Sequence, residues 1–399
     1  MRKYIFLILL AMTGPVLLAQ SREARALLSK ERREVKDAKT AAELVTVIDS
    51  TVTPMASNPE TMGLPEVYFL PGEKALKIYD LLYRNVAVGQ KPDYKAMTDM
   101  LTRAYGLLSR SLSADSTATD SKGRILRAYG KKILRLLSDY SGFYNNTARG
   151  LLNDAKDYDS AYKLLGIYAD LLENKDVSVK GTSSNRQTEI GETRYYQGLS
   201  AWCASRPELA MAAFDQAINV GYKPENLFTV ACQAAAKAKN EDKLFEYARQ
   251  GWELFGSANP NFLKMVINGY IAKNDYASAT KLLDDAIDRE PTNQNLYYSR
   301  GILEEKQGNL DEAIVAYRIT VQLNEDFAKA WFDLGRVLME KMDKEGYDEA
   351  ALDEAVSAFE NAYRLDPAGS RKALLYLRQI YYDRNEGDKL LRIEGLLNQ

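Results

Sequence analysis

Two adjacent pairs of carboxylates, Asp284-Asp285 and Glu304-Glu305, are the side chains whose types come nearest to acid–base chemistry. Neighbouring residues on a helix point about 100° apart, so neither pair converges on one substrate. We therefore predict that both pairs lie on solvated helix faces. The chain contains no histidine, which excludes Ser-His-Asp and Cys-His catalysis, histidine-ligated zinc and histidine proton shuttles.

Other motifs for cofactor or nucleic-acid chemistry are also absent from the sequence. The two cysteines, Cys203 and Cys232, are too few for a four-cysteine zinc site or an iron–sulfur cluster. Neither G-x-G-x-x-G nor a Walker loop occurs, so no nucleotide site is indicated. The 53 Lys and Arg residues nearly balance 55 Asp and Glu residues, which argues against nucleic-acid binding. We expect no catalytic residue, no metal and no cofactor.

The first 19 residues have the pattern of a cleaved signal peptide. Arg2 and Lys3 precede the apolar run from Tyr4 to Met12, and Ala19 ends a small-residue site before Gln20. The run is too short to cross a bilayer, which needs about 20 residues in a helix. No cysteine follows the run to carry a lipid anchor. The sequence therefore predicts a periplasmic or secreted protein that is not a lipoprotein and has no integral membrane segment after signal cleavage.

The C-terminal half repeats with a period of 34 residues, as the spacing from Ala279 to Ala313 shows. Large side chains recur where paired helices would need filling, and small ones recur where the helices would cross closely. Prolines recur where a second helix would have to stop. The residues predicted to pack the repeats are Gly198, Ala210, Leu263, Ala279, Ala286, Pro291, Gly301, Ala313, Tyr317, Trp331, Leu334, Gly335, Ala355, Phe359, Ala362 and Pro367.

This pattern resembles that of tetratricopeptide repeat proteins. The resemblance implies an all-α fold in which helix–turn–helix repeats stack into a superhelix, or solenoid. The layout of the whole chain, with the helix at 377–382 near its end, is similar to exported tetratricopeptide proteins of Bacteroidetes-type bacteria. The predicted repeats of the array at 191–399 are 191–224, 225–259, 260–293, 294–327 and 328–369, followed by capping helices at 370–399.

Three parts of the chain fit the repeat pattern less directly. Residues 20–190 are interpreted as degenerate helix pairs continuous with the array, with a separate helical bundle as the alternative. Polar stretches at 111–122 and 179–188 are predicted to be loops. Extra residues within 340–354 predict a lengthened helix hairpin or, alternatively, a protrusion that recognises a partner. Cys203 and Cys232 occupy different repeat positions, so we expect two free buried thiols rather than a disulfide.

In the family that the sequence resembles, certain first-helix positions face a concave groove that binds partners. Aromatic side chains beside Asn, Lys and Arg at these positions indicate a peptide-binding surface. The predicted partner-binding residues are Tyr195, Trp202, Gln233, Lys264, Asn268, Tyr298, Lys329, Phe332 and Arg336.

Chaperone-binding members of the family grip a C-terminal carboxylate with five residues across three repeats. Lys264, Asn268 and Lys329 match three of those positions. Ser299 replaces an expected Asn, and Asp333 places a negative charge where a basic residue is expected. Like charges repel, so the sequence disfavours such a clamp here.

The resemblance implies a non-catalytic periplasmic scaffold that binds a protein or peptide in its concave groove, with envelope assembly as one role. A glycan-binding outer-membrane-associated helical protein is one alternative, although such proteins are usually lipidated and rich in Trp, and this chain has three Trp. An α/α-toroid carbohydrate enzyme is another, although it would lack the 34-residue period. The identity of the partner is not readable from the sequence.

Overall fold

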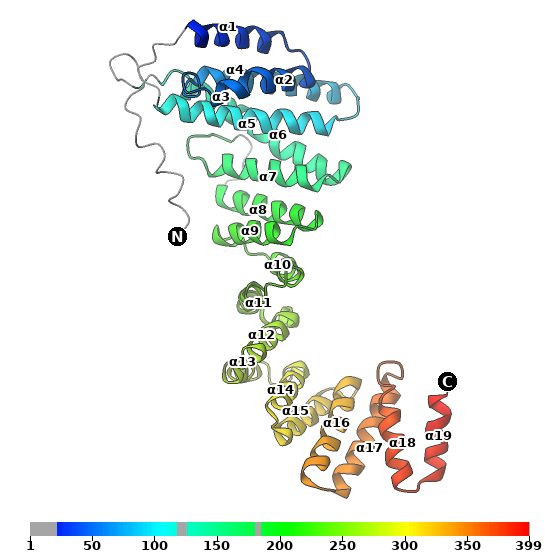
Figure 1. Cartoon of the computed structure of the whole chain (residues 1–399). Coiled ribbons are helices and arrows are strands. Elements are labelled where there is room, and N and C mark those ends of the chain that lie inside the picture. The colour runs from blue at the N-terminus through cyan, green and yellow to red at the C-terminus, as the bar shows by residue number, and fades with distance from the viewer. Residues whose placement is uncertain (1–21, 118–124, 126, 180–184, 399) are drawn as a thin grey trace. The chain divides into compact units, whose positions relative to one another are not determined.

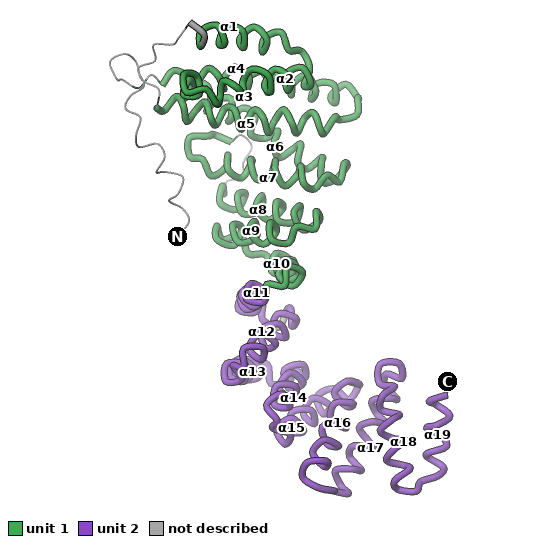
Figure 2. Tube along the Cα trace, viewed as in Figure 1, with its two compact units in different colours: residues 1–240 green, residues 241–399 purple. Residues whose placement is uncertain are grey.

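The computed structural model describes residues 22–117, 125, 127–179 and 185–398, and the signal peptide predicted at 1–19 lies outside them. The chain divides into two compact units, residues 1–240 (unit 1) and residues 241–399 (unit 2), which are coloured separately in Figure 2. Throughout the described ranges the regular structure of both units is helical, without a strand. The predicted all-α fold is confirmed.

Unit 1 begins with helix α1, continues through three short helical segments and then forms a series of longer helices (Figure 1). Its elements are α1 (Arg22–Asp37), α2 (Ala41–Val47), the π-helix η1 (Ile48–Val52), α3 (Thr53–Ser57), α4 (Pro65–Ala87), α5 (Tyr94–Thr117), α6 (Gly130–Gly150), the π-helix η2 (Leu151–Ala155), α7 (Tyr158–Glu173), α8 (Arg186–Cys203), α9 (Pro207–Asn219) and α10 (Glu225–Lys237).

The long helices of unit 1 pack as consecutive hairpins, α4 with α5, α6 with α7, and α8 with α9. Helix α7 also packs on α8, so the first predicted repeat at 191–224 belongs to the same compact unit as the residues before it. The buried Arg194 of α8 reinforces this contact, because its guanidinium lies 2.7 Å from Asp170 and 2.9 Å from Glu173 of α7. Within unit 1 the helices thus pack on one another across residue 191, and the continuation of the repeat array through 20–190 stays a prediction.

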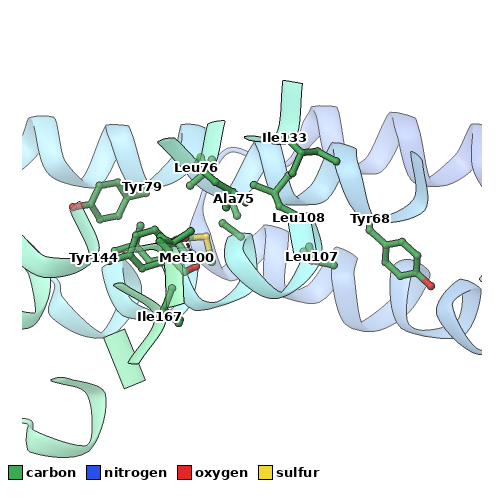
Figure 3. Close-up of a cluster of buried hydrophobic side chains, with 14 of the residues drawn as sticks. Tyr68, Ala75, Leu76, Tyr79, Met100, Leu107, Leu108, Ile133, Tyr144 and Ile167 are labelled. Carbon is green, nitrogen blue, oxygen red and sulfur yellow. Dashed lines mark hydrogen bonds between the residues drawn. The ribbon is translucent and has the colours of Figure 1, made fainter. Parts of the chain in front are cut away.

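The core of unit 1 is built from aliphatic side chains and tyrosines of α4 to α7 (Figure 3). Tyr79 and Tyr144 are completely buried. The Tyr144 hydroxyl donates to the Leu101 carbonyl at 3.1 Å, and the Tyr79 hydroxyl lies 3.0 Å from Oγ1 of Thr147. A buried tyrosine adds large apolar area without cost only when its hydroxyl finds a partner, and both do.

Two polar stretches predicted to be loops are partly helical, which corrects the sequence analysis. Helix α5 continues through 111–117, while 118–122 lie outside the described residues. The hydroxyl of Ser111 donates to the Pro65 carbonyl at 2.8 Å, and the Asp115 carboxylate accepts the N–H groups of Tyr129 and Gly130. Tertiary partners for these polar groups outweigh their weak helix propensity. Of the stretch 179–188, the part from 186 onward is the first turn of α8.

Unit 2 contains the clearest repeats and stacks its helices in chain order (Figure 1). Its elements are α11 (Glu241–Phe255), the 3₁₀-helix η3 (Gly256–Ala258), α12 (Pro260–Ala272), α13 (Tyr276–Arg289), α14 (Gln294–Gln307), α15 (Leu310–Leu323), α16 (Ala328–Glu345), α17 (Glu349–Leu365), α18 (Ala373–Asp383) and α19 (Gly387–Leu397). A toroid would close its helices into a ring, whereas these form an open row.

The predicted packing residues of unit 2 lie at helix crossings. A Cβ atom built on Gly335 of α16 would come within 2.8 Å of the Phe359 ring on α17, so only glycine allows this approach. The alanines of the pattern and Tyr317 are buried. Pro291 and Pro367 directly follow the residues that cap α13 and α17, and both helices end there as predicted.

The insertion within 340–354 lengthens one hairpin, as one of the two interpretations predicts. Helices α16 and α17 have 18 and 17 residues, whereas α14 and α15 have 14 each. At the end of unit 2, α19 covers α18 and buries Ile393, which fits the predicted cap.

Both cysteines of unit 1 are free; Cys232 is buried, but Cys203 is exposed, which corrects the expectation of two buried thiols.

Candidate partner-binding cleft

A cleft of about 290 Å³ runs across the first helices α12, α14 and α16 of unit 2. Residues four apart on a helix share a face, as Lys264 and Asn268 do on α12 and Tyr298 and Ile302 do on α14. The cleft is lined by Trp252, Pro260, Asn261, Leu263, Lys264, Ile267, Asn268, Asn293, Asn295, Leu296, Tyr298, Ser299, Ile302, Phe327 and Lys329.

The lining of this cleft is positively charged, amide-rich and partly apolar. Lys264 and Lys329 are exposed, and within the described part of the chain neither forms an ion pair. No Asp or Glu is among the lining residues. The Nζ atom of Lys329 lies 5.6 Å from the centre of the Tyr298 ring, a cation–π distance. Two unpaired cations near side-chain amides can bind a polar chain that carries negative charge.

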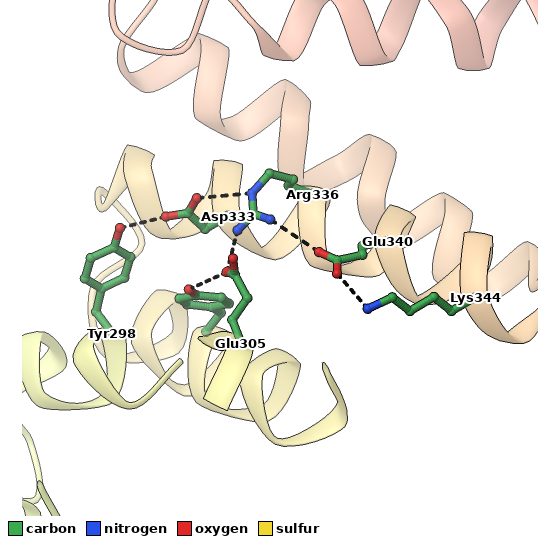
Figure 4. A network of polar contacts seen from close by, with 7 residues as sticks. Tyr298, Glu305, Asp333, Arg336, Glu340 and Lys344 are labelled. Carbon is green, nitrogen blue, oxygen red and sulfur yellow. Dashed lines mark hydrogen bonds and ion pairs between the residues drawn. The ribbon is translucent and has the colours of Figure 1, made fainter. Parts of the chain in front are cut away.

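Tyr298 is held in the wall of the cleft by contacts of its hydroxyl and of its ring. Its hydroxyl donates to Oδ2 of Asp333 at 2.6 Å, as Figure 4 shows, and its ring centre lies 5.0 Å from that of Phe327. Burial, together with the bond to Asp333, raises the pKa of the Tyr298 hydroxyl well above its usual range. Tyr298 is therefore a neutral hydrogen-bond donor with a fixed ring position.

A network of ion pairs continues from Asp333 along α16 (Figure 4). The Arg336 guanidinium pairs with Glu305 of α14, lies 3.7 Å from Asp333 and lies 3.6 Å from Glu340. Burial raises the pKa of Asp333, while the Tyr298 bond and Arg336 oppose that rise. Arg336 offsets part of the charge of these three carboxylates, and its pair with Glu305 ties α14 to α16. None of the four side chains lines the cleft.

The structure brings together four of the nine predicted partner-binding residues, because Lys264, Asn268, Tyr298 and Lys329 all line the cleft. Arg336 does not line it and is engaged by the three carboxylates. Phe332 does not line it either, and its ring packs 5.9 Å from that of Phe359. Phe332 and Arg336 thus lie outside this cleft, and a partner contact at either one stays a prediction.

The remaining predicted residues lie in unit 1. Tyr195 is only 6% exposed and packs against the rings of Phe214 and Tyr222, which corrects its prediction as a partner-binding residue. A large aromatic residue at that position fills the crossing of α8 and α9 instead. Trp202 is half-buried, with the Lys237 ammonium 5.3 Å from its ring centre, and Gln233 is exposed. A partner contact at Trp202 or Gln233 stays a prediction.

Sequence reasoning missed two aromatic residues of the cleft, Trp252 and Phe327. Trp252 belongs to α11, and Phe327 directly precedes α16, so neither occupies a first-helix groove position. A prediction that considers only the groove positions of the first helix of each repeat does not include these two residues. The available signal is an aromatic residue immediately before a first helix, as Phe327 is.

The two carboxylate pairs behave differently from each other. Glu304 is buried and its carboxylate lies 2.6 Å from the Arg300 guanidinium, so the predicted solvated face is wrong for this residue. Glu305 instead pairs with Arg336 and accepts the Tyr317 hydroxyl at 3.2 Å. Asp284 and Asp285 are exposed, as predicted.

The described residues contain neither a candidate metal site nor a candidate membrane span. No cluster of three or more Cys, Asp or Glu side chains is arranged there to hold a metal ion. None of the helices that the structure describes combines the length and the apolar character needed to cross a membrane.

Comparison with known families bears directly on the repeats that form the cleft. The family model for the tetratricopeptide repeat matches residues 267–325 and 298–370. These matched residues of unit 2 are similar to tetratricopeptide repeats. The matched residues contain α14 and α16, which are two of the helices that line the cleft.

Individual proteins are similar over parts of the chain. DnaJ homolog subfamily C member 7 from Homo sapiens is 26% identical over 208 residues, which are 51% of this chain and 35% of the human protein. The chain thus spans about a third of that protein's length. The C-terminal part of a TPR repeat-containing protein from Cytophaga hutchinsonii has a TM-score of 0.43 at 13% identity, covering 71% of this chain and 99% of that one. YrrB, described as a TPR protein with an unusual peptide-binding site, has a TM-score of 0.33 at 14% identity, covering 47% and 95%.

Proposed function

We propose that unit 2 binds an extended peptide segment of a partner protein in the cleft across α12, α14 and α16. The observation that carries the proposal is the lining itself, in which exposed Lys264 and Lys329 lie in one cleft with Asn268 and the fixed ring of Tyr298. Side-chain amides can pair with a peptide backbone, and aromatic and aliphatic side chains can accept its apolar residues.

The role that we propose is that of a scaffold without catalysis. The lining residues include no carboxylate, cysteine or histidine to act as nucleophile or general base. A preformed cleft with unpaired cations is instead suited to recognition, since the bound segment supplies the missing counter-charge. The predicted signal peptide at 1–19 supports a location outside the cytoplasm, where envelope assembly is one role that a peptide-binding scaffold can serve.

The test begins with an array of immobilised random decapeptides probed with the labelled full chain. Peptides that bind are then measured by fluorescence polarisation against the wild type and the double variant Lys264→Ala/Asn268→Ala. Both side chains are exposed, so the substitutions leave the core intact. We expect binding to weaken about tenfold or more, as for anchor residues of a small interface.

A matched control replaces two exposed residues with the same spacing on the second helix α13, Lys281→Ala/Asp285→Ala. This variant should bind the selected peptides as the wild type does. An array without binders, or equal binding by the cleft variant, would contradict the proposal. Saturable binding of oligosaccharides that the cleft variant abolishes would favour the glycan-binding alternative.

A further inference from the structure

Unit 1 contains a cavity of about 690 Å³ that the proposed function does not use. It lies between the segment 48–57, the turn at Met62 and helix α5. Its apolar lining is formed by Ile48, Val52, Ala56, Met62, Tyr68 and Leu107. This volume is within the range of small-molecule sites, which are mostly apolar with a few polar groups.

The first half of the segment 48–57 departs from regular α-helix. Residues 48–52 form the π-helix η1, in which the N–H of Thr53 reaches back to the Ile48 carbonyl. Pro54 follows and has no N–H to continue an α-helical ladder. The hydroxyl of Thr51 donates to the Val47 carbonyl at 2.7 Å. Single π-helical turns occur often at functional sites, and this one carries Ile48 and Val52 into the cavity wall.

The floor of the cavity is made of buried side chains, whereas its rim exposes apolar surface to solvent. Ile48, Val52 and Leu107, which form this floor, are each at most 8% exposed. Met62 at the rim is 52% exposed, although methionine is a flexible apolar side chain that packs readily on a ligand. An apolar molecule bound in the cavity would cover the exposed Met62 side chain and remove its apolar surface from water.

The polar groups at the cavity are cationic. Arg103 and Arg110 of α5 both line it, and seven residues along a helix return to the same face after about 10 Å of rise. No Asp or Glu is among the lining residues. Arg103 lies 3.7 Å from the exposed Asp49, whereas Arg110 forms no ion pair with any residue that the structure describes. Arg110 is therefore the cation available to a ligand.

We propose that this cavity binds one small amphiphilic acid, with its apolar body on the floor of Ile48, Val52 and Leu107 and its carboxylate at Arg110. An arginine guanidinium binds a carboxylate through two parallel hydrogen bonds, which is the strongest pairing available to it. An alcohol with the same alkyl chain as the acid has no carboxylate and would lack that pairing. A cationic amphiphile would be repelled by both arginines.

The test titrates the full chain with dodecanoate below its micelle concentration by isothermal calorimetry, beside dodecanol and dodecyltrimethylammonium. We expect saturable binding of one dodecanoate per chain, with dodecanol weaker by about tenfold or more and the cation weaker still. Absence of saturable dodecanoate binding, or equal binding of the alcohol or the cation, would overturn the proposal.

Two pairs of variants locate the site. Arg110→Gln should weaken dodecanoate about fivefold or more, whereas Arg135→Gln, an exposed arginine of α6, should not. Gly106 of α5 lines the cavity, and a Cβ atom there meets no other atom within 4 Å. Gly106→Phe should therefore block binding, and Gly106→Ala should leave it nearly unchanged. Circular dichroism and thermal melting confirm that each variant is folded, and a folded Gly106→Phe or Arg110→Gln that binds as the wild type does would refute the site.

Discussion

The hydroxyl of Tyr298 donates to Oδ2 of Asp333 at 2.6 Å, which joins α14 to α16 beside the cleft of unit 2. The Tyr298 hydroxyl and the Arg336 guanidinium both contact the Asp333 carboxylate, and this carboxylate does not line the cleft. The same bond fixes the Tyr298 ring as one wall of the cleft. The contact therefore links the stability of the repeat stack to the shape of its binding surface.

Removing the Tyr298 hydroxyl should destabilise the chain. Tyr298→Phe leaves the largely buried Asp333 without this donor, which should lower the free energy of unfolding by about 1–3 kcal/mol. Tyr382→Phe is the matched control, because Tyr382 is 68% exposed and should change stability little. Urea denaturation followed by circular dichroism measures both. A double-mutant cycle with Asp333→Asn should show a coupling of about 1 kcal/mol, and additive losses would mean that the two groups do not interact.

Enlarging Gly335 should disrupt the crossing of α16 and α17. Even a Cβ atom there lies 2.8 Å from the Phe359 ring, so Gly335→Leu should cost about 1–3 kcal/mol or more through overpacking. Gly395→Leu on α19 serves as the control, since a Cβ atom there meets nothing within 4 Å. Thermal melting compares the two variants. Equal melting temperatures for Gly335→Leu and the wild type would contradict the assigned helix crossing.

The stability of unit 1 should fall as the pH rises toward neutrality, because of Glu31 on α1. Its side chain is completely buried, and neither carboxylate oxygen has a hydrogen-bond partner among the residues that the structure describes. Burial raises the pKa of Glu31 from 4.5 to about 7 despite the nearby Arg32. The folded state therefore holds the proton more tightly than the unfolded chain, and the cost of ionising the buried group grows between pH 4.5 and about 7.

Substitution of Glu31 isolates this contribution. Relative to Glu31→Gln, the wild type should lose about 1–3 kcal/mol of stability between pH 5 and pH 8. Denaturation at pH 5, 6, 7 and 8 measures the difference. Parallel pH profiles for the two proteins would show that Glu31 titrates in the folded state as it does in the unfolded chain.

Export should remove the first 19 residues. If the predicted signal peptide is cleaved, the mature chain begins at Gln20 or one residue to either side. Intact mass spectrometry of the protein expressed in a bacterium that exports it measures the N-terminus. Retention of residues 2–15 in the recovered protein would rule out the predicted cleavage.

The sequence alone predicts the fold of unit 2 well, because its repeats are locally consistent. Gly335 and Phe359 are complementary partners in a single helix pair, and Pro367 ends the second helix at the place where the structure ends it. Each of these choices is made within one repeat, so a periodic pattern of large, small and helix-ending residues is enough to identify them. The same register placed Lys264, Asn268, Tyr298 and Lys329 on one surface.

Only the tertiary structure decides the roles of residues that are contacted by neighbouring helices. Tyr195 and Phe332 have the types of binding residues, but neighbouring rings cover or engage them. From the sequence alone, the negative charge of Asp333 argues against an anionic ligand. In the structure, the Asp333 carboxylate is instead contacted by the Tyr298 hydroxyl and by Arg336. Residue type and spacing specify which helix face a side chain occupies, whereas its exposure and its counter-charge depend on the neighbouring helices. That is why the repeat could be predicted from the residues and the composition of the cleft could be established only from the packed helices.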